Sequence, residues 1–95
     1  MDRKPIKDIV KDSRWQKVRK SLLGQWKERP TWCCDQVKKY LGKPTGASND
    51  ELRIVMNYLT GSAFRMGKIK NPCVSKIRQD ISQEVKERKS QARWY

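Results

Sequence analysis

The sequence predicts an all-α fold, a small single-domain bundle of four or five helices. Apolar residues recur at spacings of three and four along most of the chain, and capping signals precede these stretches. There is neither a sustained β alternation nor an Asn-Gly or Asp-Gly hairpin signal. A chain of 95 residues fits one domain, residues 1–95, with a limited core. The residues expected to be buried together are Trp15, Leu22, Val37, Leu52, Val55, Leu59, Val74, Ile77 and Ile81.

The first third of the chain predicts a basic arm followed by one helix. Residues 1–12 form the arm, and Ser13 with Gln16 matches a capping box that opens the helix. Gly24 is expected to bend or stop this helix, and Pro30 to end whatever remains of it. Its apolar stripe consists of Trp15, Val18, Leu22 and Trp26.

The middle of the chain predicts two further helices separated by a flexible loop, residues 43–47. Thr31 is the expected N-cap of the first, and Gly42 suits its left-handed end. Ser48 and Glu51 form a second capping box for the next helix. The inner faces are expected to hold Trp32, Cys33, Val37, Tyr40 and Leu41, and then Leu52, Val55, Met56 and Leu59.

The last helix is expected to run from Asn71 to about Lys89, with residues 90–95 as a tail. Asn71 can cap it and Pro72 suits its first position. The helical spacing places Val74, Ile77, Ile81 and Val85 on one face. One flank of that face carries the acids Asp80, Glu84 and Glu87. The other flank is free of carboxylates and carries Ser75, Gln79, Ser82, Lys86 and Lys89.

The stretch from Leu52 to Val85 resembles helix-turn-helix DNA-binding regulators. Ala63 corresponds to the small residue of the first helix, and Gly67 to the turn. The resemblance implies that helix 71–89 enters the major groove of duplex DNA. The implied base contacts are Ser75, Lys76, Gln79 and Gln83. The implied phosphate contacts are Arg65, Lys68, Lys70, Arg78, Lys86 and Lys89.

The net charge of +13 makes nucleic acid the leading partner. Lys and Arg exceed Asp and Glu by ten to four in residues 1–29 and by nine to three in residues 61–95. The sequence therefore predicts a DNA-binding protein, acting in transcription regulation in the cytoplasm, on the nucleoid or in a host cell.

Two alternatives use the same composition differently. An RNA-binding or ribonucleoprotein module would contact the backbone without reading the major groove, which A-form RNA hides. An adaptor or assembly factor, or a homodimer, would bind through exposed aromatic residues, for which Tyr58, Trp94 and Tyr95 are candidates. The side of the third helix formed by Ile54 and Tyr58 is a candidate subunit contact.

Catalysis, metal binding and membrane insertion are not expected. The chain has no histidine, and its glycines form no phosphate-binding loop. Asp80 followed by Glu84-Val85-Lys86 faintly resembles a nuclease motif, but the spacing is that of a helix. Three cysteines without histidine are too few for a tetrahedral zinc site, so no cofactor is predicted. Neither a membrane-spanning run nor a signal peptide is expected.

Overall fold

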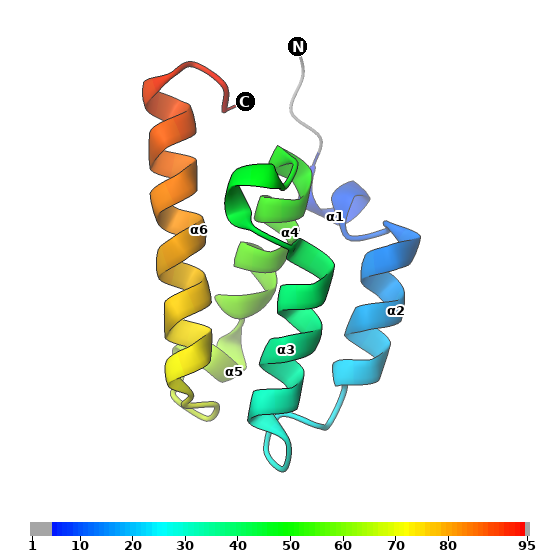
Figure 1. The fold of residues 1–95 in the computed structure, drawn as a ribbon. Helices are drawn as coiled ribbons and strands as arrows, with labels where there is room; N and C mark the ends of the chain where they lie inside the picture. The colour runs from blue at the N-terminus through cyan, green and yellow to red at the C-terminus, as the bar shows by residue number, and fades with distance from the viewer. Residues whose placement is uncertain (1–4, 95) are drawn as a thin grey trace.

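A computed structural model describes residues 5–94, except for the side chains of residues 62 and 63, and shows the predicted all-α fold (Figure 1). Residues 5–94 contain no strand. The elements are α1 (Ile6–Ile9), α2 (Ser13–Leu22), α3 (Pro30–Leu41), the 3-10 turn η1 (Pro44–Gly46), α4 (Asn49–Leu59), α5 (Ser62–Arg65) and α6 (Pro72–Ser90).

Helix α4 is the centre of the packing, with α1, α3 and α6 all packed on it. Its apolar residues explain this position. Leu52, Ile54, Val55 and Leu59 are all buried and occupy more than one side of the helix. Helix α6 runs along the outside of the bundle beside α4 and α3 (Figure 1). All nine residues predicted for the core are buried, with exposed fractions of 4% or less.

Two of the expected caps are confirmed. The Ser48 hydroxyl accepts from the Glu51 amide at 3.1 Å, while the Glu51 carboxylate accepts from the Ser48 amide at 3.0 Å. Asn71, directly before Pro72, caps α6, and its side chain accepts from the Cys73 amide at 2.8 Å. These contacts satisfy amides that would otherwise lack partners in the first turn.

Two other helix starts differ from prediction. Asp12, not Ser13, caps α2, and its Oδ1 accepts from the amides of Arg14 at 2.8 Å and Trp15 at 3.3 Å. A carboxylate is favoured there because it accepts two hydrogen bonds and faces the positive end of the helix dipole. Pro30 begins α3 at its first position instead of ending a helix, so Thr31 is not the cap. Helix α2 stops at Leu22, before the left-handed Gly24.

Ile54 and Tyr58, the candidate subunit contact on α4, make contacts within the chain. Ile54 is 1% exposed. Tyr58 is half-buried in an aromatic cluster, with its ring centroid 5.2 Å from that of Trp15, and its hydroxyl accepts from Trp26 Nε1 at 2.9 Å. A tyrosine hydroxyl at a buried site usually has such a partner.

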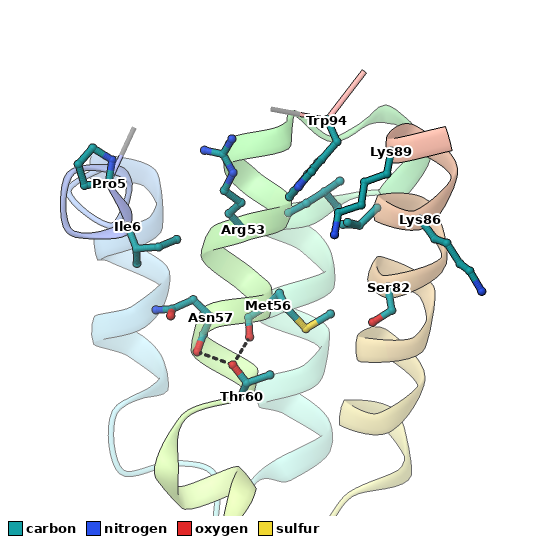
Figure 2. A pocket seen from close by; sticks show the side chains of 12 residues that line it. Pro5, Ile6, Arg53, Met56, Asn57, Thr60, Ser82, Lys86, Lys89 and Trp94 are labelled. Carbon is teal, nitrogen blue, oxygen red and sulfur yellow. Dashed lines mark hydrogen bonds between the residues drawn. The ribbon is translucent and has the colours of Figure 1, made fainter. Parts of the chain in front are cut away.

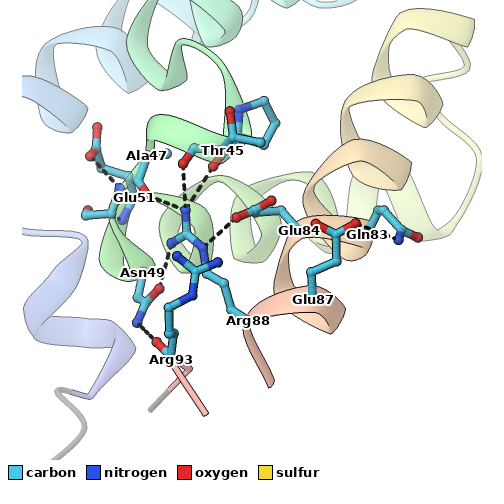
Figure 3. A network of polar contacts seen from close by, with 11 residues as sticks. Thr45, Ala47, Asn49, Glu51, Gln83, Glu84, Glu87, Arg88 and Arg93 are labelled. Atoms are coloured by element: carbon cyan, nitrogen blue, oxygen red, sulfur yellow. Dashed lines mark hydrogen bonds and ion pairs between the residues drawn. The ribbon is translucent and has the colours of Figure 1, made fainter. Parts of the chain in front are cut away.

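Helix α6 contains a buried ion pair whose arginine also bonds to the η1 loop and to the start of α4 (Figure 3). Glu84 and Arg88 are 5% and 6% exposed, and Arg88 Nε donates to Glu84 Oε1 at 2.8 Å. The other guanidinium nitrogens donate to Asn49 at 2.7 Å and to the carbonyls of Pro44 and Ala47 at 3.0 and 2.7 Å. The prediction that Glu84 lies on an acidic flank facing solvent is therefore wrong. Its carboxylate is buried and is neutralised by an arginine of the same helix.

Helix α6 ends in a left-handed turn at Ala92, which has a φ of 57°. The Arg93 amide donates to the Arg88 carbonyl at 2.8 Å, and the Ala92 amide to the Lys89 carbonyl at 3.2 Å. This hydrogen-bond pattern is a Schellman motif, whose left-handed position favours glycine. The turn directs Trp94 back onto the core, against which its side chain packs.

We expect Ala92→Gly to stabilise the protein by about 0.5–1 kcal/mol, because glycine adopts this conformation without a Cβ clash. Urea unfolding followed by circular dichroism measures the change. Ala47→Gly is the control, since Ala47 has an ordinary extended backbone and is 6% exposed. That change should destabilise, and stabilisation by both glycines would contradict the assignment of strain to Ala92.

Candidate nucleic-acid interface

A groove runs between α4 and α6, on the flank of α6 that the sequence predicts to be free of carboxylates. It consists of two adjoining hollows of about 710 and 850 Å³. Both hollows are lined by Met56 and Thr60 of α4 and by Ser82 and Lys86 of α6. Figure 2 shows the upper hollow, where Trp94 lies above the side chains of the two helices. We call the two hollows together the α4–α6 groove.

Lysines and arginines supply all of the charge of the α4–α6 groove, because none of its lining residues is an Asp or Glu. The exposed cations along its α6 wall are Lys86 and Lys89, and the half-buried Arg78 lines the lower hollow. The exposed or half-buried acids of α6 do not line the groove: Asp80 pairs with Lys76 at 3.0 Å, and Glu87 accepts at 3.1 Å from Gln83, which lines the lower hollow. The absence of carboxylates from the groove favours anionic groups as its ligands.

Acidic side chains gather in a separate hollow where α1 and the start of α2 meet the start of α4. Asp8, Asp12, Asp50 and Glu51 line this hollow. Four carboxylates and Arg14 therefore line this hollow, whereas every charged residue that lines the α4–α6 groove is a lysine or an arginine.

The structure brings together three of the four predicted base contacts. Ser75, Gln79 and Gln83 all line the lower hollow and are exposed. Lys76 does not line it, and its ammonium pairs with Asp80, because the two lie one helical turn apart on the outer side of α6.

The predicted phosphate contacts fall into two groups. Arg78, Lys86 and Lys89 lie along the α4–α6 groove. Arg65, Lys68 and Lys70 are exposed on α5 and on the loop before α6. Arg65 donates to the Thr60 carbonyl at 3.3 Å, and Lys70 lines a further small hollow at the start of α6. The second group therefore stands near the positive end of the α6 dipole.

The segment before α6 contains the predicted turn. Gly67 has a φ of 72°, a conformation that favours glycine. Helix α5 is a single turn, and residues 66–71 separate it from α6. Ala63, assigned as the small packing residue, lies outside the side chains that the structure describes.

Sequence reasoning missed Arg53, which forms part of the α4 wall of the groove. Its side chain is buried, its Nη1 pairs with Asp50 at 3.1 Å, and its Cζ lies 5.3 Å from the centroid of the Trp94 ring. Arg53 Nε has no hydrogen-bond partner among the described residues. The i, i+3 spacing of Asp50 and Arg53 was an available signal for their ion pair. The contact of Arg53 with Trp94 had no such signal, because it depends on the turn at the end of α6.

Two of the three cysteines, Cys33 and Cys34, are buried, and Cys73 is half-buried. Cys33 and Cys34 are fully buried, and burial, with a smaller effect of neighbouring Cys73, raises the pKa of Cys34 to about 12. Burial likewise raises the pKa of Tyr40 to about 12. Groups with such values stay neutral at physiological pH and are poor nucleophiles. Among the described residues, no three His, Cys, Asp or Glu side chains are grouped to hold a metal ion.

Comparisons with protein-family models, curated proteins and solved structures gave no significant match for this chain. Within residues 5–94, no helix has the length and apolar character needed to cross a membrane.

Proposed function

We propose that this protein binds duplex DNA through α6 and regulates transcription in the cytoplasm. The observation that carries the proposal is the flank of α6 from Ser75 to Lys89, which exposes hydroxyl, amide and ammonium groups and no carboxylate. Amides and hydroxyls bond to base edges, while ammonium and guanidinium groups bind phosphates. The net charge of +13 supplies the general attraction to a polyanion.

In the proposed complex α6 lies in the major groove, with Ser75, Gln79 and Gln83 towards the bases. Arg78, Lys86 and Lys89 bind phosphates on one side. The exposed Arg65, Lys68 and Lys70 extend this contact beyond the start of α6. Lys76 is not assigned a base contact, since its ammonium is bound to Asp80 at 3.0 Å.

We expect the affinity for DNA to fall steeply with salt. With about six phosphate contacts, the slope of log K against log salt should be near −5, because each contact releases condensed counterions. Fluorescence anisotropy with labelled duplex DNA, single-stranded DNA and duplex RNA measures it. A slope near zero for every nucleic acid would contradict the proposal. Stronger binding to duplex RNA than to duplex DNA would favour RNA binding as the function instead.

We expect substitutions on α6 to separate sequence reading from backbone binding. Gln79→Ala should cost about 1–3 kcal/mol at one base position of a sequence selected from a random pool, because an amide contact is lost. Ser75→Ala should likewise alter the preference among sequences. Lys86→Ala should weaken all sequences alike and reduce the salt slope by about one.

Asp80→Ala is the control for these substitutions, because Asp80 lies outside the α4–α6 groove and pairs with Lys76, which is assigned no base contact. It should not change the order of preferred sequences. If Asp80→Ala changes that order and Gln79→Ala does not, α6 does not read DNA with this flank.

A further inference from the structure

The α4–α6 groove has an apolar floor, which phosphate binding does not use. In the upper hollow, the floor is formed by the buried Leu52 and by the half-buried Met56, Val85 and Trp94. Ile6 of α1, which is 37% exposed, lies on the opposite edge. Met56 continues the floor into the lower hollow. Leu52 is fully buried, so the accessible part of the floor consists of the half-buried Met56, Val85 and Trp94. An apolar strip that stays accessible in a folded small domain is typical of a binding surface.

The shape of the groove favours a rod-shaped ligand over a small one. The two hollows share four lining residues and follow α6 from Ser75 to Lys89. Fifteen residues of α helix correspond to about 20 Å at 1.5 Å per residue. Grooves of this length between two helices accept the apolar face of a third helix, with anchors at i, i+3, i+4 and i+7.

The charge of the groove selects the kind of helix. Lys86, Lys89 and Arg78 follow its α6 side, and no carboxylate lines it. A basic helix would be repelled there, which disfavours a second copy of this chain, since each copy carries +13. A helix with glutamates and aspartates beside its apolar face would instead meet the cations of the α6 wall.

We propose that the α4–α6 groove binds an acidic amphipathic helix of a partner protein. The apolar face of that helix lies on Met56, Val85 and Trp94, and its acids pair with Lys86 and Lys89. This interaction is separate from the proposed DNA binding. If both occur, the two ligands compete, because both use Lys86 and Lys89.

The test uses the full chain and a labelled acetylated peptide of about 18 residues with leucines at i, i+3, i+4 and i+7 and glutamates elsewhere. Its control is a peptide of the same composition in scrambled order. We expect the ordered peptide to bind at least about tenfold more tightly than the scrambled one, measured by anisotropy. Equal binding would show attraction by charge alone and would overturn the proposal.

Two matched double variants locate the site. Lys86→Glu with Lys89→Glu should weaken the ordered peptide by at least about tenfold. Lys20→Glu with Lys39→Glu, at exposed positions of α2 and α3 outside the groove, makes the same change in net charge. It should weaken binding by less than about threefold, because distant exposed charges are screened by salt. Equal losses in the two variants would contradict the site.

Ser82→Arg separates docking from attraction. Ser82 is exposed and lines both hollows, so an arginine there fills the groove and adds a positive charge. Docking predicts weaker peptide binding, while attraction alone predicts stronger binding. Duplex DNA tested with the same variants keeps the two proposals distinct. If the peptide binds and DNA does not, only the proposed function is refuted. If the groove variants change DNA binding but not peptide binding, the helix site is refuted.

Discussion

Replacing Arg88 with methionine is expected to cost about 3–5 kcal/mol of folding free energy, because it leaves a buried carboxylate without its partner. Glu84 is 5% exposed and pairs with Arg88 alone among the described cations. The change also removes the donors for Asn49 and for the carbonyls of Pro44 and Ala47. Urea unfolding monitored by circular dichroism measures the loss. Small domains are commonly stable by only about 5–15 kcal/mol, so this loss is large.

Lys89→Met is the matched control, since Lys89 is the next residue of α6 and is exposed. It should change stability by less than about 0.5 kcal/mol. Adding Glu84→Leu to Arg88→Met should recover part of the loss, because an apolar pair can replace a buried ion pair. If Arg88→Met behaves like Lys89→Met, the contacts of Arg88 do not hold the η1 loop.

Replacing Trp15 with alanine is expected to cost about 3–5 kcal/mol, the usual range for a large aromatic side chain in a core. Trp15 is 1% exposed, and its ring centroid lies 5.1 Å from that of Tyr40 and 5.2 Å from that of Tyr58. The substitution therefore leaves a cavity where α2, α3 and α4 meet. Unfolding in urea again provides the measurement, with the unfolding midpoint as its readout.

Trp32→Ala is the control, because Trp32 is only half-buried and stacks on Arg29, whose Cζ lies 4.3 Å from its ring centroid. It should cost clearly less than Trp15→Ala. Equal losses would mean that burial does not distinguish the two tryptophans. In that case the contacts of Trp15 with Tyr40 and Tyr58 would not be a major source of stability.

The helices and the core could be predicted because both depend on patterns within single segments. The spacing of Val74, Ile77 and Ile81 defines the inner face of α6, and Asn71-Pro72 defines its start. The start of α2 was misplaced by one residue, because Asp12 and Ser13 are both good caps. Only the backbone conformation decides between two neighbouring candidates.

The polar contacts between distant segments could not be predicted in the same way. Arg88 lies seven residues after Ile81, on the apolar line of α6, and this spacing was the available signal for its burial. Apart from Glu84, its acceptors lie 39 to 44 residues away in sequence, so no local pattern identifies them. The groove likewise depends on the packing of α4 on α6, although its carboxylate-free wall follows from α6 alone.

The acidic hollow and the α4–α6 groove give two places on the molecule opposite local charge, within a net charge of +13. A polyanion or an acidic partner is attracted less strongly near the four carboxylates than at the groove, so encounters at the groove become more frequent without any gain in contact area. Added salt shortens the range of this preference and slows association. Neutralising Asp50 and Glu51 would strengthen the overall attraction but weaken the preference for the groove.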